Sequence, residues 1–141
     1  MALSFKYKSI QRPNGIGVKS PVIPVVLSGN GSIKQEFVAL IDSGADLSVI
    51  PEDVAELLNL NLKKTIEKSR GIGGEVDVKN TEMNLSIKKG HESYTFSIPV
   101  QVVLGDSKIP PLLGRRGFFD KFRITFDQAN FSISLKRNTE R

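Results

Sequence analysis

Apolar and polar residues alternate in short segments along most of the chain, and Gly, Pro and Asn residues separate these segments at close intervals. A period of two fits a β-strand with one buried face, and closely spaced turn residues are typical of all-β proteins. At 141 residues the chain is long enough for one hydrophobic core and too short for a second. We therefore expect a single all-β domain spanning residues 1–141. The pattern predicts strands at residues 3–8, 22–27, 33–41, 66–70, 76–79, 83–87, 94–103, 122–126 and 131–135.

Local patterns refine this prediction. Residues 13–15 and 30–31 are turn sequences, and the second favours a tight hairpin with two residues at positive φ. Residues 37–41 include no polar residue, which indicates a central strand buried on both faces. The best helix signal is at residues 51–60, where proline and acidic residues precede apolar residues at helical spacing. The polar residues 136–141 are predicted to form a frayed tail.

The composition excludes several classes of function. The sequence has no cysteine, which rules out disulfides, thiolate nucleophiles, zinc fingers and iron–sulfur clusters. Its one histidine, His91, is expected in an exposed turn, and a single histidine cannot build a histidine-rich metal site. The net charge is +5, but the basic residues form no clustered stripe and no aromatic stacking platform accompanies them. We expect neither a metal site nor a nucleic-acid partner.

The hydrophobic pattern also bears on location. No apolar run approaches the length of a membrane span. Residues 1–12 alternate between polar and apolar types, where a signal peptide would need a continuous apolar segment. We therefore expect an intracellular, cytoplasmic protein with no membrane partner.

The most informative residues follow the apolar run that ends at Ile41. Asp42 comes directly after it, and a carboxylate at the end of a buried strand is costly unless hydrogen bonds or a function compensate. The next residues are Ser43, whose hydroxyl can bond to neighbouring backbone, and Gly44, which lets the backbone approach closely. By themselves these residues are weak evidence, because Asx turns use the same types. Asp42 is nevertheless a candidate site residue.

Three motifs follow one another along the chain. They are Leu40-Ile41-Asp42-Ser43-Gly44-Ala45-Asp46-Leu47-Ser48-Val49-Ile50, then Gly71-Ile72-Gly73-Gly74, then Leu112-Leu113-Gly114-Arg115. In residue types and in order, these motifs resemble those of the retropepsin-like aspartic proteases, the single-domain relatives of pepsin that include the retroviral proteases. Residues 122–135 also look like the closing hairpin of pepsin-like lobes. The resemblance covers about residues 20–135, which would form the core of the domain.

The resemblance implies the fold of a single-lobe acid protease, which is a closed β-barrel with one short helix and a glycine-rich flap hairpin. It also implies an aspartic endopeptidase, in which two aspartates share one proton and activate a water molecule that attacks the peptide bond. This sequence has only one Asp-Ser-Gly. The two carboxylates would therefore be Asp42 of each subunit of a homodimer. The substrate would be a peptide or protein segment in extended conformation, and no metal or organic cofactor is implied.

The resemblance also assigns roles to individual residues. Ser43 would hold the two active-site loops together across the dimer, and Gly44 would offer its carbonyl to the substrate backbone. Asp46 and Arg115 would form a buried bidentate ion pair, with Gly114 as structural support. Ile72 would cover the substrate. The substrate-binding residues would be Ala45, Asp46, Gly71, Ile72, Gly73, Gly74, Leu112 and Leu113.

The final strand is a candidate for the dimer contact. In residues 131–135, Phe131, Ile133 and Leu135 share one face. We expect this strand to lie at a sheet edge and to pair with, or be covered by, the second subunit.

Two residues depart from the family's pattern, and two other functions stay open. Arg116 stands where relatives often have Asp or Asn, and Glu75 places a charge beside the flap tip. The main alternative is a non-catalytic retropepsin-like module that binds peptide or protein, although such a module has no need of a costly buried acid. A nucleic-acid-binding β-domain is a more distant alternative. A phosphate loop at residues 71–74 is disfavoured, because no Gly-Lys-Ser/Thr sequence follows.

Overall fold

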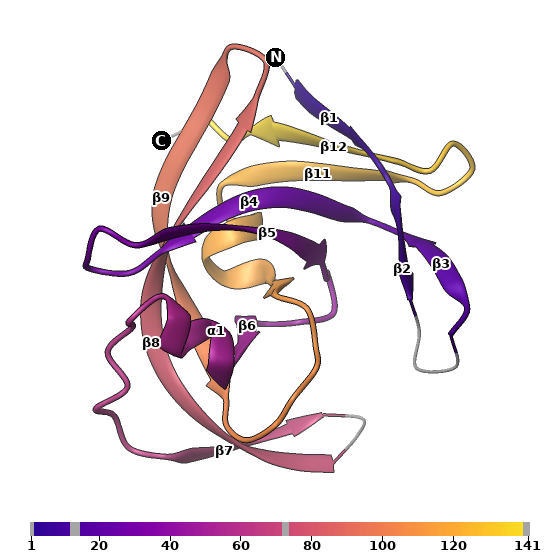
Figure 1. Ribbon diagram of the computed structural model, residues 1–141. Coiled ribbons are helices and arrows are strands. Elements are labelled where there is room, and N and C mark those ends of the chain that lie inside the picture. Colours follow the sequence, from indigo (N-terminus) through magenta and orange to yellow (C-terminus); the bar gives the residue numbers. More distant parts are fainter. Residues whose placement is uncertain (1, 12–14, 72–73, 140–141) are drawn as a thin grey trace.

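The alternating segments form β-sheets joined by short loops, as a computed structural model shows (Figure 1). The structure describes residues 2–11, 15–71 and 74–139. In chain order the elements are β1 (Ala2–Lys6), β2 (Lys8–Gln11), β3 (Gly17–Ser20), β4 (Val22–Ser28), β5 (Lys34–Ile41), β6 (Ser48–Pro51), α1 (Glu52–Leu57), β7 (Glu67–Gly71), β8 (Gly74–Lys89), β9 (Glu92–Val103), β10 (Leu112–Leu113), the helical turn η1 (Arg115–Phe119), β11 (Phe122–Asp127) and β12 (Ser132–Arg137). The prediction of a mostly β fold with one short α-helix is confirmed.

The largest sheet has the strand order β4-β5-β10-β6-β9-β8-β7. β4 pairs with β8 as well as with β5, so the strand order returns to its starting strand. β10 runs parallel to β5 on one side and antiparallel to β6 on the other. This insertion of β10 places the Leu112-Leu113 motif directly beside the strand that leads to Asp42.

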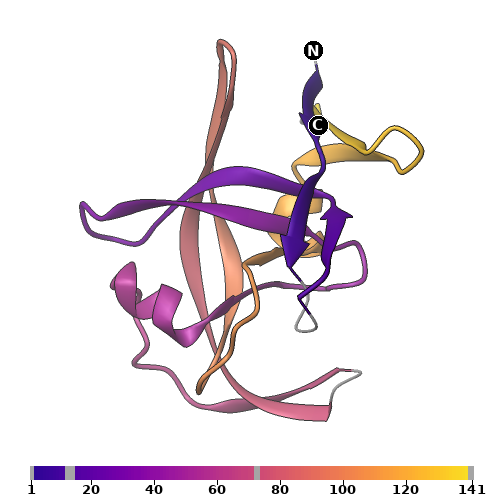
Figure 2. The same ribbon diagram turned by 45° about the vertical axis from the view of Figure 1, so that its right-hand side comes forward.

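The long strands β8 and β9 provide much of the hydrophobic core. They pair antiparallel along their length, and alternate side chains face the core. Met83, Leu85, Ile98 and Val100 are each at most 2% exposed. Figure 2 shows this hairpin running over most of the height of the molecule.

Residues 76–79 and 83–87, expected as two strands, belong to the single strand β8. Thr81 and Glu82 lie between them and keep the pairing with β9, opposite Val100 and Pro99. The polar residues interrupt the hydrophobic pattern, but the register of the β8–β9 pairing continues through them.

The apolar run 37–41 forms the end of β5, which lies between β4 and β10 as the predicted central strand. The expected burial on both faces is wrong. Ala39 and Ile41 face the core and are at most 3% exposed, whereas Val38 is 42% exposed. Leu40, which shares the face of Val38, is half-buried. Only one face of β5 packs on the core.

The predicted hairpin at Asn30-Gly31 joins β4 to β5, but it is not a tight turn. Ser28 pairs with Lys34, and neither Asn30 nor Gly31 has a positive φ. The loop is longer because it reaches the end of α1, where a Cβ atom on Gly29 would lie 2.7 Å from a backbone oxygen. The other predicted turn, at residues 13–15, lies mostly outside the described residues.

A three-stranded sheet has the order β1-β12-β11. Leu3 of β1 lies opposite Leu135 of β12, and β11 pairs along the other side of β12. β12 is therefore a central strand, and Ile133 and Leu135 are buried in the core. The prediction of an edge strand available to a second subunit is wrong, because β1 and β11 already occupy both of its edges. The predicted tail at 136–141 also begins too early, because residues 136–137 belong to β12.

The predicted helix at residues 51–60 is α1 followed by a short turn. Pro51 ends β6 and caps the helix, and Glu52 and Asp53 occupy its first turn. Ala55 and Leu58 are fully buried against the sheet. In the part of the chain that the structure describes, no helix is both long enough and apolar enough to span a membrane.

Candidate active site

Asp42 begins the loop that joins β5 to β6. Its backbone N–H donates a hydrogen bond of 3.0 Å to the carbonyl of Leu113, the last residue of β10. Because β10 is paired between β5 and β6, this bond continues the sheet one residue beyond the end of β5. The first and third sequence motifs therefore meet at Asp42.

A local turn orients the Asp42 side chain. Its Oδ1 atom accepts a hydrogen bond of 2.9 Å from the backbone N–H of Gly44. Its carbonyl accepts a second bond, of 3.2 Å, from the N–H of Ala45. The Oδ2 atom has no hydrogen bond within the described chain. One carboxylate oxygen is thus fixed and the other remains available.

The expected deep burial of Asp42 is wrong for the single chain. Asp42 is half-buried, and Ser43 and Gly44 beside it are exposed. The physical reason is that the loop turns outward directly after β5, so the carboxylate keeps contact with solvent.

Backbone hydrogen bonds hold the loop in place. The N–H groups of Arg115 and Arg116 donate to the carbonyls of Ala45 and Asp46, at 2.9 and 2.8 Å. These bonds join the Asp42 loop to the segment that follows β10.

Gly114 and Ser48 tighten the same junction. A Cβ atom on Gly114 would lie 2.5 Å from the carbonyl oxygen of Leu47, so only glycine fits there without a shift of the backbone. The Gly114 N–H donates to the Ser48 hydroxyl at 3.1 Å, and Ser48 is fully buried. Ser48 was not predicted as a site residue. Its signal in the sequence is a single hydroxyl between the apolar residues Leu47 and Val49.

The predicted buried bidentate pair of Asp46 and Arg115 is wrong for the single chain. The one ion-pair contact, between Arg115 Nη2 and Asp46 Oδ1, is 3.9 Å long, and the two side chains are 55% and 65% exposed. Arg115 Nη1 also donates to the carbonyl of Ser43 at 3.4 Å. Backbone groups and Ser48 occupy the buried part of this junction, which leaves both charged side chains outside it.

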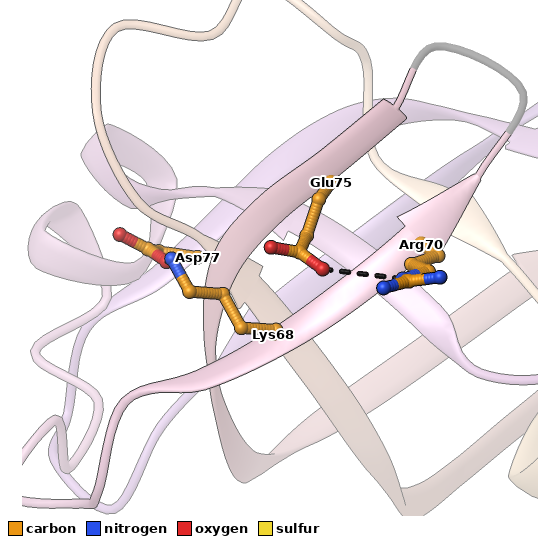
Figure 3. A network of polar contacts seen from close by, with 4 residues as sticks. All are labelled: Lys68, Arg70, Glu75 and Asp77. Atoms are coloured by element: carbon orange, nitrogen blue, oxygen red, sulfur yellow. Dashed lines mark hydrogen bonds and ion pairs between the residues drawn. The ribbon is translucent and has the colours of Figure 1, made fainter.

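The β7–β8 hairpin ends at Gly71 and Gly74, which lie opposite each other. Ile72 and Gly73, the predicted tip, lie outside the described residues. On one face of the hairpin, Lys68 pairs with Asp77 and Arg70 with Glu75, each pair directly across the two strands (Figure 3). Glu75 is therefore paired within the hairpin.

The other face of this hairpin is less polar. Ser69 and Val76 lie on it with Gly71 and Gly74, above a hollow of about 260 Å³ that Val49 also lines. The hairpin thus carries its two ion pairs on one face, whereas Val76 and Val78 lie on the other face with Glu67 and Ser69.

The predicted substrate-binding leucines differ in exposure. Leu112 is half-buried, whereas Leu113 is fully buried in the core. The expectation that Leu113 lines a substrate pocket is wrong, because the alternation along β10 turns its side chain inward.

A second hollow, of about 900 Å³, adjoins Asp42. The end of β5, the residues before β10 and the β2–β3 hairpin line it, and Figures 1 and 2 show that hairpin beside the end of β5.

Other polar groups lie away from Asp42. A hydrogen bond to Glu92 raises the pKa of Tyr94, and bonds from Asn130 lower the pKa of Asp127. Among the described residues, no cluster of His, Asp and Glu side chains is arranged to hold a metal ion.

Comparisons with known proteins complete the description of this site. A family model described as aspartyl protease matches residues 23–116. No curated protein matches the sequence. Among solved structures, the chain is similar to a retropepsin-like aspartic protease from Rickettsia conorii, with a TM-score of 0.59 and 18% identity over 96% of this chain and 98% of that one. This likeness shows the fold.

Two further structures match less well. The retroviral protease-like domain of Ddi1 from Leishmania major has a TM-score of 0.48 and 16% identity over 84% of this chain and 96% of that one. The EIAV protease in complex with the inhibitor HBY-793 has a TM-score of 0.41 and 22% identity, over 69% of this chain and 83% of that one.

Proposed function

Because the chain belongs to the aspartyl protease family, we propose that it is an aspartic endopeptidase. Two Asp42 carboxylates, one from each subunit of a homodimer, activate a water molecule that attacks a peptide bond. The position of Asp42 carries this proposal. Its backbone is bonded to Leu113, its Oδ1 is bonded to Gly44, and its Oδ2 is unbonded within the described chain.

The reaction needs two carboxyl groups in different protonation states. The ionised carboxylate takes a proton from the water, while the protonated one donates a hydrogen bond to the substrate carbonyl. The water oxygen bonds to the carbonyl carbon, and protonation of the amide nitrogen then lets the C–N bond break. Two carboxylates at hydrogen-bonding distance share one proton, because both cannot ionise cheaply.

The second carboxylate comes from a second copy of the chain. The sequence holds one Asp-Ser-Gly. In a two-fold symmetric dimer, a residue that lies next to the axis meets its own copy in the other chain. The exposure of Ser43 and Gly44 supports this arrangement, since both are accessible to a partner.

We extend the proposal to the parts of the fold around Asp42. The ring of strand pairings that β4 and β8 complete forms the closed barrel of a single-lobe acid protease, whose domain spans residues 1–141. The β7–β8 hairpin is its flap, with Ile72 at the tip. The hollow beside this hairpin supports that role, because its valines, Val49, Val76, Val78 and Val103, would shield a substrate side chain from water.

The alternative is a non-catalytic module with the same fold that binds an extended peptide. One observation favours it. Asp42 is only half-buried and accepts a local hydrogen bond, so retaining an unused carboxylate there costs little. The cost of a buried acid therefore does not separate the two functions.

Digestion of unfolded casein tests the proposal. We expect cleavage by the purified chain, inhibition by a statine-type compound, and no cleavage by Asp42→Asn, whose amide fits the same space but cannot act as a base. Asp106→Asn, which changes an exposed aspartate in another loop, serves as the matched control and should cleave normally. Specific activity should fall on dilution through the dimer dissociation constant.

The results separate the two functions. Wild-type rates in Asp42→Asn, or turnover that does not depend on protein concentration, contradict the shared pair of carboxylates. Peptide binding without turnover by the wild-type chain establishes the binding module.

A further inference from the structure

Two basic side chains lie opposite each other on the outer face of the sheet β1-β12-β11 (Figure 1). Arg123 of β11 is paired directly with Lys136 of β12. Leu135 is buried in the core, so alternation along β12 turns Lys136 outward, and Arg123 shares its face. Both residues are exposed. Like charges directly opposite each other destabilise a sheet, so this pair lowers the stability of the chain unless an anion binds to both.

The charges of this pair are not neutralised by a neighbour on the sheet. Neither Arg123 nor Lys136 forms an ion pair within the described residues. Asp127 lies on the same face of β11, but it is about 13 Å further along the strand. Its two carboxylate oxygens accept hydrogen bonds from Asn130.

Two other acidic side chains near this end of the sheet are also held by partners. Asp120 Oδ2 accepts a hydrogen bond of 3.0 Å from the Gly117 N–H, and Glu92 Oε2 accepts one of 2.7 Å from the Tyr94 hydroxyl. Glu140 lies outside the described residues. In the part of the chain that the structure describes, the potential around Arg123 and Lys136 is therefore positive and attracts an anion.

A small hollow adjoins the pair. Its volume is about 130 Å³, and its lining residues are Arg123, Lys136, Arg137, Asn138 and Thr139. The backbone N–H and the side-chain amide of Asn138 donate to the carbonyls of Lys121 and Asp120, at 2.9 and 3.1 Å. These bonds fix the segment after β12 beside the start of β11.

Arg137 contributes little charge to this hollow. It follows Lys136 and lies on the opposite face of β12, where its guanidinium carbon is 5.1 Å from the centroid of the Tyr94 ring. The two side chains that can donate to an anion from the outer face are therefore those of Arg123 and Lys136.

The surroundings of the pair indicate which anion fits. A planar guanidinium and an ammonium together match the several acceptor oxygens and the double negative charge of a phosphate group. The next positions on the outer face are Ser4, Ser134 and Thr125. They provide no aromatic ring on which a nucleic-acid base would stack and no large apolar group that would enter a membrane. The face thus favours a single phosphate group over a nucleic acid.

We propose that Arg123 and Lys136 form a binding site for one phosphate group where β11 begins and β12 ends. Both side chains donate hydrogen bonds to the phosphate oxygens, so the bound anion replaces the repulsion between the two cations with an attraction to each. The site lies outside residues 23–116, which the family model matches. It does not depend on the proposed peptidase activity.

Titration of the ¹⁵N-labelled protein with inorganic phosphate tests the site by NMR. Sodium chloride keeps the ionic strength constant, so that general screening does not change. We expect a dissociation constant on the order of 1 mM and chemical-shift changes centred on the amides of Arg123 and Lys136. Acetate should bind more weakly at the same ionic strength, because it carries one negative charge.

A pair of double variants separates this site from general attraction to a basic protein. Arg123→Gln with Lys136→Gln should weaken phosphate binding by about tenfold or more. Lys34→Gln with Lys63→Gln removes two exposed positive charges elsewhere and should keep the wild-type affinity. If the first double variant does not fold, the single variants decide, because each should weaken the binding separately.

Thermal unfolding gives a second measurement that a purely structural pair would not produce. In phosphate-free buffer of low ionic strength, the double variant at the site should melt at a higher temperature than the wild-type protein, because the repulsion is removed. Phosphate should raise the melting temperature of the wild-type protein and leave that of the variant unchanged.

Two phosphate esters identify the source of the phosphate group. Glycerol 3-phosphate that binds as tightly as inorganic phosphate indicates a soluble ester, and weaker binding of this ester indicates inorganic phosphate itself. Binding only to vesicles that contain phosphatidic acid, lost in the Arg123→Gln and Lys136→Gln variant, indicates a lipid phosphate. An equal response to acetate and phosphate, binding that survives in this variant, or no binding to any of the three forms overturns the inference.

Discussion

The Asp42 loop and the outer end of the β7–β8 hairpin are held in different ways. The loop is joined to the segment after β10 by backbone hydrogen bonds and by the buried hydroxyl of Ser48. The hairpin end is held by its ladder and by two ion pairs whose side chains are all at least 43% exposed. The comparison teaches that this molecule fixes the position of its candidate catalytic group through backbone hydrogen bonds and the close packing of the buried residues Ser48 and Gly114. It stabilises the end of the β7–β8 hairpin through exposed groups that solvent can replace.

The largest difference in the free energy of unfolding should appear between alanine substitutions at two glycines, one in each region. Gly114→Ala should lower the free energy of unfolding by about 3 kcal/mol, because the new methyl group meets backbone at Leu47. Gly71→Ala in the hairpin is the matched control and should be nearly neutral, because no atom lies within 4 Å of its added Cβ. Urea unfolding measures both. Equal effects would mean that the loop is no more tightly packed than the hairpin.

A serine in each region gives the next largest contrast. Ser48→Ala should lower the free energy of unfolding by about 1 to 2 kcal/mol, because the buried N–H of Gly114 loses its acceptor. Ser69→Ala in β7 should change it by less than about 0.5 kcal/mol, as is usual for positions outside a buried network. A smaller effect at Ser48 than at Ser69 in thermal unfolding would contradict the importance of this bond.

The ion pairs of the β7–β8 hairpin should contribute less to stability than the Ser48 hydrogen bond does. A double-mutant cycle of Lys68→Ala and Asp77→Ala should give a coupling free energy of about 0.2 to 1 kcal/mol, because both side chains are solvated. The coupling should shrink at high salt, since exposed charges are screened. A coupling that is large and independent of salt would place these charges in a buried environment.

The smallest effect on stability is expected from the substitution of Arg115. Its ion pair with Asp46 is long and exposed, so Arg115→Ala should change the stability of the monomeric chain by less than about 0.5 kcal/mol. Differential scanning calorimetry at concentrations that keep the chain monomeric is the appropriate measurement. A loss of several kcal/mol would restore the buried pair that the sequence motif implies.

The sequence predicted the features that depend on local pattern. Alternation located most strands, Pro51 and the following acids located α1, and the motifs around Asp42 and Leu112 identified the family. These features depend on residue types at fixed spacing, which a single sequence shows directly.

The features that depend on tertiary neighbours were not predictable in the same way. Val38 is more apolar than Ala39, yet Val38 is the exposed one, because the pairing of β5 and the position of the core decide which face is buried. The ends of β12 and its burial depend on β1, which is distant in sequence. For the same reason the predicted burial of the Arg115–Asp46 pair was wrong, because a sequence motif does not show how deeply its side chains are buried.

The pairing of β1 with β12 has a consequence for biosynthesis. β1 precedes all other described strands along the chain, and its pairing partner in the described structure is the one that comes after all of them. While the polypeptide leaves the ribosome, Leu3 and Phe5 lack their pairing partners until β12 has emerged. Closing so long a loop is entropically costly, and contacts between distant residues slow folding. The joining of these two strands should be a late step in folding, and the apolar side chains of β1 lack their partners in β12 until then.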